Sequence, residues 1–414
     1  MRWECLEGVE AVRARAAAWD NLWSRSDETS PTARCEAVCL WHAHFHPKVP
    51  LRVIAVLDGN ELIAVLPLSS RGWPQVGTLP SNDWVAGGTL LIDPDRDLMR
   101  VADCLLEGLT HSPFIGCVFR GVPIDRAAWR ALTAASVRAG WHHVLQPLHD
   151  IGTIDLTPSW QQTETRLGGN YRRQMAKAQR RLEAAGKLEF VMRDSSVADA
   201  TGSSWEAALR EGWELEARGW KGREGTAIAQ QPGLMAFMAR HAAALAGASR
   251  IPDHPALATG GVGDIDDAGQ RVAACGVRIA TLRLDGRPIA FLYCWFGKDC
   301  VFTPKIAYDE SYAECSPGKL VFYWNLRDLI GDGHWRLLDM AGPLADYNAK
   351  WATGAYAATT LVLGKPGLQG RLFAAAYAAR RRLRDWRKRG PTGASRGPAG
   401  NTASDQDQRA ASAS

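Results

Sequence analysis

The residues best suited to chemistry lie in VFTPKIAYDESYAECSPGKL, residues 301–320. A β-branched and aromatic run and a polar connector lead to Ser316-Pro317-Gly318-Lys319, which opens an apolar segment. Ser is a favoured N-cap and Pro suits the first turn, so this tetrapeptide predicts a helix start. Free N–H groups there, beside a glycine with no side chain, can hold an anionic phosphate. The same tetrapeptide also opens ordinary helices, so its surroundings decide between the two interpretations.

Three polar residues precede this helix start. Lys305 interrupts an apolar strand predicted at 301–306, where it either reaches out to water or binds a phosphate or carboxylate. Tyr308 and Asp309 follow, between strand and helix, where site residues collect in α/β proteins. Asp309 can equally be a simple turn former.

Two carboxylates are candidates for a site as well. Asp339 closes the predicted strand WRLLDM, residues 335–340, where an acid either caps a turn or belongs to a site. Glu216 precedes Gly219-Trp220-Lys221-Gly222, and its alternative is a surface ion pair with Lys221 or Arg218.

The composition indicates a globular protein of two or three domains. The chain has 414 residues, of which 46% are hydrophobic and 22% charged. No stretch approaches 18 uncharged apolar residues and the start has no signal-peptide core, so we expect a cytoplasmic protein. Nine cysteines without a repeating spacing indicate reduced thiols.

The net charge of +5 is concentrated near the C-terminus. Residues 371–389 carry eight bases and one acid, which leaves −2 for the rest of the chain. This segment, within 366–390, is predicted to form a basic amphipathic helix that contacts an acidic membrane surface, a nucleic acid or a partner. Residues 391–414 are predicted to be a disordered tail.

Two hairpins indicate two halves. Residues 52–69 turn at Asp58-Gly59 and residues 278–296 turn at Asp285-Gly286, each preceded by a helical region and followed by a strand and a helix. We therefore expect two mixed-sheet α/β (α+β) halves, residues 1–157 and 158–365. After the first hairpin the sequence has no signal like Ser316–Lys319 for a phosphate-binding helix start, only the segment SNDWVAGG. The anion site is therefore expected in the second half.

Some local predictions are more specific. Residues 1–48 are predicted to be mostly helical. A short helix is predicted near 347–351 and a final strand near 357–364, within the second half. Cys35, Cys39, His42 and His46 follow one helix over about 16 Å at about 1.5 Å per residue, too extended for one tetrahedral ion, so no metal site is expected.

Four segments in order carry a resemblance to a known family: GNYRRQMAKAQRRLEAAGKLEF, LEARGWKGREGTAI, KIAYDESYAECSPGKL, and LLDM followed by NAKW. Together they resemble the FemAB-like, CelD-like branch of the GNAT acyltransferase superfamily. The resemblance implies a tandem GNAT-like fold and acyl transfer from a thioester or aminoacyl donor to an amine or hydroxyl. Acetyl-CoA or another acyl-CoA would be a co-substrate, with no tightly bound cofactor.

The resemblance also suggests roles for the site residues. The donor would be held by Ser316, Pro317, Gly318, Lys319 and Lys305. Asp339 is the first candidate for general base, followed by Glu216, with Tyr308 as a further catalytic candidate. The acceptor, a small molecule or an envelope or polysaccharide precursor, would contact Trp220, Lys221, Asp309, Lys350 and Trp351.

Two alternatives stay open at this stage. The predicted helix 171–185 is strongly basic, with Arg172, Arg173, Lys177, Arg180 and Arg181 against Glu183, and fits an aminoacyl-tRNA donor. The chain lacks the long helical arm of the peptidoglycan-bridge enzymes, however, which argues against tRNA. A nucleic-acid partner is therefore not expected, with tRNA as the one possible exception. A non-catalytic assembly component of a polysaccharide system, held near the inner membrane face by 371–389, is the other alternative.

Overall fold

The structure, a computed structural model, describes residues 1–72, 75–85, 87–195, 204–247 and 275–388. By its internal contacts the chain divides into a large unit, Met1–Ala374, and a second unit, Ala375–Ser414. Both predicted halves, residues 1–157 and 158–365, lie within the large unit, and the boundary between them stays a prediction.

The first half begins with a strand, so the prediction that residues 1–48 are mostly helical is wrong at its start. Arg2–Glu7 pairs with the first hairpin, and this long-range pairing decides its conformation. The elements of this half are β1 (Arg2–Glu7), α1 (Val9–Arg13), α2 (Ala16–Arg25), η1 (Pro31–Ala33), α3 (Cys35–Phe45), β2 (Arg52–Asp58), β3 (Glu61–Arg71), β4 (Val76–Thr78), β5 (Leu91–Ile92), α4 (Leu98–His111), β6 (Gly116–Pro123), α5 (Ala127–Arg138) and β7 (His142–Asp155).

The second half contains the predicted helix at 171–185 and the predicted strands near 301–306, 335–340 and 357–364, but residues 347–351 form turns in place of the predicted short helix. Asn348 accepts from Ala345 N–H and donates to the Pro343 carbonyl, bonds that fold the backbone locally. The elements are α6 (Trp160–Leu167), α7 (Gly169–Ala185), β8 (Leu188–Asp194), α8 (Trp205–Arg218), α9 (Trp220–Arg223), η2 (Ile228–Gln230), α10 (Leu234–Gly247), β9 (Cys275–Leu284), β10 (Arg287–Gly297), β11 (Cys300–Tyr308), η4 (Glu310–Cys315), α11 (Pro317–Asp332), β12 (Leu337–Pro343), β13 (Gly354–Gly364) and α12 (Leu368–Lys388).

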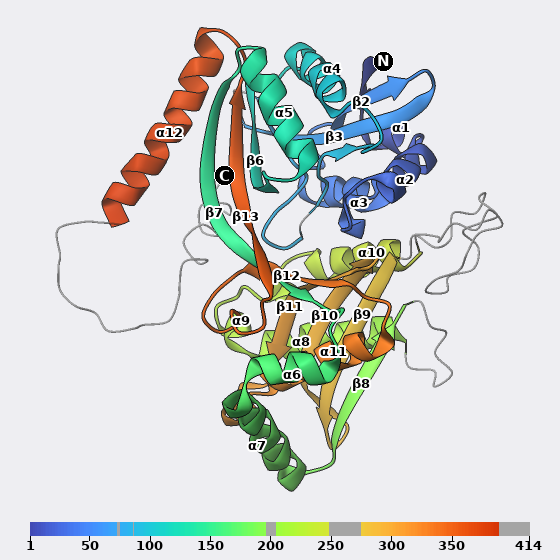
Figure 1. Cartoon of the computed structure of the whole chain (residues 1–414), viewed down its shortest axis with the longest axis vertical. Coiled ribbons are helices and arrows are strands. Elements are labelled where there is room, and N and C mark those ends of the chain that lie inside the picture. Colours follow the sequence, from blue (N-terminus) through green and yellow to red (C-terminus); the bar gives the residue numbers. More distant parts are fainter. Residues whose placement is uncertain (73–74, 86, 196–203, 248–274, 389–414) are drawn as a thin grey trace. The chain divides into compact units, whose positions relative to one another are not determined.

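The strands form one continuous mixed sheet in the order β1-β2-β3-β4-β6-β13-β7-β12-β11-β10-β9-β8, with β5 paired to β3. Figure 1 labels most of these strands. The last strand, β13, inserts between β6 and β7 of the first half. The far end of β7 in turn pairs with β12 of the second half. The two halves thus exchange strands, and the fold is of the mixed α/β class expected from the sequence.

Both predicted hairpins are confirmed. β2 pairs with β3 around Gly59, and β9 pairs with β10 around Asp285 and Gly286. At the second turn Asp285 and Gly286 have φ of 47° and 75°, the left-handed pair that a tight hairpin turn requires.

Strand β10 alternates between two hydrophobic cores, as a strand covered on both faces must. Phe291, Tyr293 and Trp295 belong to the core beneath α8 and α10, which we call the α8 face. The intervening residues Leu292 and Cys294 belong to the core beneath α11, the α11 face. This alternation assigns neighbouring residues of β11 to one face or the other.

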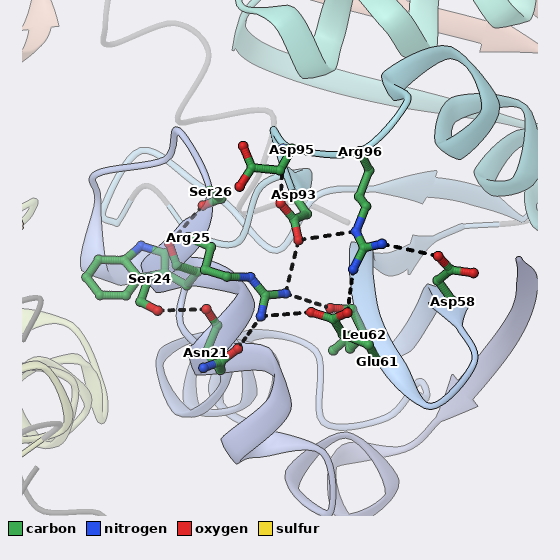
Figure 2. A network of polar contacts seen from close by, with 11 residues as sticks. Asn21, Ser24, Arg25, Ser26, Asp58, Glu61, Leu62, Asp93, Asp95 and Arg96 are labelled. Carbon is green, nitrogen blue, oxygen red and sulfur yellow. Dashed lines mark hydrogen bonds and ion pairs between the residues drawn. The ribbon is translucent and has the colours of Figure 1, made fainter. Parts of the chain in front are cut away.

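A polar network holds the first hairpin in place (Figure 2). Arg25, at the end of α2, lies 3.2 Å from Asp93 and 3.1 Å from Glu61. Arg96 contacts Asp58 at 3.2 Å and also pairs with Glu61. The network ties α2 and the segment after β5 to the turn of the hairpin.

Several sequence predictions concern the C-terminal region. α12 covers the predicted basic helix, but its side chains beyond Arg380 and the predicted tail at 391–414 lie outside the described residues. Membrane contact through 371–389 therefore stays a prediction. Among the described residues, no helix is both long enough and apolar enough to cross a membrane. All nine cysteines are free thiols.

Candidate active site

The candidate site is built where β11 and β12 part. These parallel strands pair only along Cys300–Phe302 and Leu337–Asp339. Beyond these residues β11 runs on to Tyr308 and β12 to Pro343 without pairing to each other. Beyond this point the facing backbone N–H and C=O groups of the two strands do not bond to each other, so they can bond to a ligand that lies between the strands.

The start of α11 lies after the free end of β11. Ser316 is the N-cap residue, as predicted, but it adopts φ 46° and ψ 51° and its side chain makes no capping bond. Pro317 has no N–H, and Lys319 and Leu320 N–H donate to the Ser316 carbonyl at 3.0 and 3.1 Å. Gly318 N–H has no acceptor among the described residues, which leaves this donor for an anion.

Gly318 is also needed for packing. A Cβ at this position would lie 3.0 Å from the Tyr308 ring and 3.7 Å from Ile306. Tyr308 is therefore brought directly to the predicted donor site, and this residue is 41% exposed. Asp309 caps η4 by accepting from Ser311 N–H at 2.9 Å, the turn-forming alternative that the sequence left open.

Lys305 lies on the other face of the sheet. It pairs with Tyr293, a residue of the α8 face, whereas Ile306 pairs with Leu292 of the α11 face. A register shift in β11 between Phe302 and Lys305 sets this orientation. The structure thus does not bring Lys305 to the start of α11, with which the sequence analysis had grouped it.

The ammonium of Lys305 lies over the Trp84 ring, 5.3 Å from its centroid. Trp84 comes from the loop after β4, so the first half contributes directly to this side of the site. Burial, followed by repulsion from Lys221, lowers the pKa of Lys305 to about 8. The predicted alternative of a lysine reaching freely into water does not describe this environment.

Glu216 and Lys221 lie near enough to Lys305 to shift its pKa, and the Lys221 ammonium lies over the Trp220 ring, 5.9 Å from its centroid. Glu216 is 3% exposed, pairs with Lys221 at 2.5 Å and accepts from Ile228 N–H at 3.1 Å. The ion pair anticipated as an alternative for Glu216 is thus present, and it is buried on the carboxylate side. Trp220 is 45% exposed, and its backbone N–H donates to the Glu310 carboxylate at 2.7 Å.

Asp339 is the last β12 residue paired with β11, so it marks the point where the strands part. Its side chain is 2% exposed and accepts from Ala341 N–H at 2.7 Å and from the Tyr356 hydroxyl at 2.8 Å. Burial raises the pKa of Asp339, while these hydrogen bonds and Arg126 oppose the rise. A carboxyl with a raised pKa is a better proton acceptor than an ordinary aspartate.

Lys350 and Trp351 lie elsewhere. Trp351 is buried against Tyr171 and Phe322, with ring centroids 5.1 and 5.0 Å away. Lys350 is exposed, and its carbonyl accepts from Arg166 at 3.3 Å. Trp351 thus packs the α11 face, and neither residue is brought to the cluster around Lys305 and Glu216.

Three residues of the site were not singled out from the sequence. Trp84 lies in the SNDWVAGG segment, and Glu310 follows Asp309 directly, so both stood next to residues already noted. Glu310 anchors α9 by accepting from Trp220 N–H and from Arg223, both at 2.7 Å. Tyr356 stands among small residues in β13, and nothing in its local pattern links it to Asp339.

Comparison with known proteins recognises a domain that contains part of this region. Residues 266–349 match the family model described as "Acetyltransferase (GNAT) domain", and these include β11, the start of α11 and Asp339. A search of curated proteins gives no match.

Solved structures share the fold at low sequence identity. The C-terminal domain (DUF2156) of a putative lysylphosphatidylglycerol synthetase from Agrobacterium fabrum is 11% identical, with TM-score 0.51, over 89% of this chain and 96% of that one. A conserved protein of unknown function from Bacteroides thetaiotaomicron is 13% identical, with TM-score 0.50, over 84% and 97%. A tandem GNAT protein from the clavulanic acid biosynthesis pathway is 11% identical, with TM-score 0.42, over 89% and 100%.

Proposed function

We propose that this protein is an acyltransferase whose second half transfers an acyl group from acyl-CoA to an amine or hydroxyl. One observation carries the proposal: inside the segment that matches the GNAT domain, β11 and β12 part, and the free end of β11 leads to a helix start that no side chain caps. The splayed strands would hold the pantetheine arm, and Gly318 N–H would bond to the pyrophosphate.

The reaction we propose is a direct attack. The acceptor nitrogen or oxygen bonds to the thioester carbonyl carbon, the C–S bond breaks, and CoA leaves as a thiolate that takes up a proton. Asp339 accepts the proton of the attacking group. Because both Asp339 oxygens are already bonded, the proton reaches it through the Tyr356 hydroxyl, which passes its own proton to the carboxylate.

The acceptor would approach from the α8 face, where Trp220, Lys221 and Glu216 lie. We propose a small-molecule acceptor, with envelope or polysaccharide precursors as the first class to assay. This side is bounded by both halves, because Trp84 comes from the first and Lys305 from the second.

Isothermal titration with acetyl-CoA and longer acyl-CoAs tests the proposal. We expect one binding site with a dissociation constant in the micromolar to millimolar range. Truncated analogues such as acetylpantetheine, which lack the pyrophosphate, should bind more weakly. Absence of binding by every acyl-CoA at millimolar concentration would reject the proposed donor.

The alternative donor, an aminoacyl-tRNA, is favoured by one feature. Helix α7 exposes five basic side chains, while the residues on its other face are buried. If tRNA is the donor, a gel shift with charged tRNA will weaken steeply with salt, because phosphate contacts release counterions. The exposed bases of α7 are Arg172, Arg173, Lys177, Arg180 and Arg181.

A further inference from the structure

Lys305 is placed to meet an acyl donor. It lies three positions beyond Phe302, the last β11 residue paired with β12, and so in the part of β11 that has left its parallel neighbour. Its side chain is on the α8 face, the side from which the acceptor would approach. Within the described residues, its ammonium makes no hydrogen bond or ion pair; Trp84 covers it instead.

Burial favours the neutral amine of Lys305 at moderate pH. Lys221 of α9 repels its charge, while Glu216 of α8 and Asp83 of the loop after β4 oppose that effect. With a pKa of about 8, about a tenth of the Lys305 side chains carry a neutral, nucleophilic amine at pH 7. An ordinary exposed lysine is almost wholly protonated at that pH.

Lys298 provides a matched comparison within the same chain. Its pKa is also lowered to about 8 by burial, and its ammonium also lies over a Trp ring, 5.1 Å from the Trp23 centroid. Lys298, however, lies in the turn before β11, on the opposite side of the paired stretch from Lys305, and it donates to the Ser26 carbonyl. The two lysines share chemistry and differ in position.

We propose that Lys305 is a self-acylation site, modified by the bound acyl-CoA when no acceptor occupies the site. This inference rests on the proposed function. The neutral Lys305 amine attacks the thioester carbonyl carbon, an amide N–C bond forms, and the C–S bond breaks. The amine proton is released and the CoA thiolate takes up a proton, so the products are N-acyl-Lys305 and free CoA.

The test is to incubate the full chain with acetyl-CoA alone and to map acetylated lysines by peptide mass spectrometry. Proximity to the bound donor should make acetylation of Lys305 at least about tenfold faster than that of Lys298. Excess CoA should block the reaction at Lys305. Acetic anhydride, which needs no binding site, should modify the two lysines to similar extents. Lys305→Arg should remove the donor-dependent modification without moving it to Lys298.

Titration calorimetry on the same sample separates the two claims. If acetyl-CoA binds but Lys305 stays unmodified, or Lys298 is acetylated equally fast, self-acylation is wrong and the proposed donor stands. If acetyl-CoA does not bind at all, both the proposed function and this inference fail. Modification of Lys305 that excess CoA does not reduce also overturns the inference, because it would not come from a bound donor.

Discussion

Helices α4 and α11 hold corresponding places in the two halves. Each connects a strand to its parallel neighbour: α4 lies between β4 and β6, and α11 between β11 and β12. The start of α4 is occupied by a carboxylate, because Asp97 accepts from Met99 and Arg100 N–H at 3.1 and 3.2 Å. The start of α11 has no capping side chain.

This difference at the helix start distinguishes two otherwise corresponding strand–helix–strand units. An N-capping aspartate satisfies the first N–H groups and neutralises the positive end of the helix. Such a start is stable and has little attraction for another anion. At the start of α11 no side chain makes such a bond, and among the described residues the Gly318 N–H has no acceptor, so it is available to a ligand. The comparison therefore supports the proposal that the second half binds the donor and the first half serves as a scaffold.

The largest expected effect is that of Asp339→Asn on turnover. An amide cannot accept the proton of the attacking group, so we expect a rate lower by about 10² to 10⁴ with donor affinity unchanged. Release of CoA thiol from acetyl-CoA, followed over a panel of primary amines and aminosugars, measures it. Normal turnover would remove Asp339 from the mechanism and make Glu216 the next base to test.

The same assay has a predicted pH dependence. Because the pKa of Asp339 is raised, activity should fall with decreasing pH earlier than an ordinary aspartate would allow, as the base becomes protonated. Tyr356→Phe should slow turnover and alter this acidic limb, since it removes the hydroxyl that connects Asp339 to the acceptor.

Next in size is Gly318→Glu. A carboxylate at the start of α11 repels the donor phosphates and crowds the Tyr308 ring, so donor affinity should fall at least about tenfold, or about 1.4 kcal/mol. Gly318→Ala is the matched control, because it adds the crowding without the charge. Titration of acetyl-CoA into both variants separates the two causes. Unchanged affinity in Gly318→Glu would place the phosphates elsewhere.

A smaller effect is expected from Asp97→Ala in the first half. Loss of this cap should lower the free energy of unfolding by about 1 kcal/mol, seen as an earlier urea transition. Donor affinity should stay at the parent value. If it falls instead, α4 takes part in donor binding and the assignment of roles to the two halves fails.

The smallest effect is expected from Arg96→Gln in the network of Figure 2. Its contacts with Asp58 and Glu61 are partly exposed, so the loss should be under about 1 kcal/mol. Arg25 remains 3.2 Å from the buried Asp93, which keeps that carboxylate paired. A loss of several kcal/mol, measured by the same urea titration, would show that the hairpin depends on this network far more than its exposure suggests.

Local sequence patterns predicted much of the fold. The turns at Gly59 and Gly286 follow from turn chemistry, and the start of α11 follows from Pro317 at its first position; both effects act over a few residues. The insertion of β13 between β6 and β7 could not be predicted in this way, because its partners lie more than 200 residues away in the chain. Strand pairing over such distances depends on the whole sheet.

The site was predictable to a similar extent. Tyr308 and the helix start were found because they are neighbours in sequence, and they do meet. The side of the sheet on which Lys305 lies depends on a register shift in β11, and no local sequence pattern indicated this shift. The bond between Tyr356 and Asp339 joins two strands that flank β7, so it follows from the strand exchange and not from either segment alone.

Hydrogen–deuterium exchange with and without acetyl-CoA tests most directly the claim that the second half binds the donor and the first does not. The account predicts slower exchange in the presence of acetyl-CoA at the start of α11 and in the free part of β11, residues 303–308. It predicts no change at the start of α4. Slower exchange at the start of α4, with none at α11, would contradict the account.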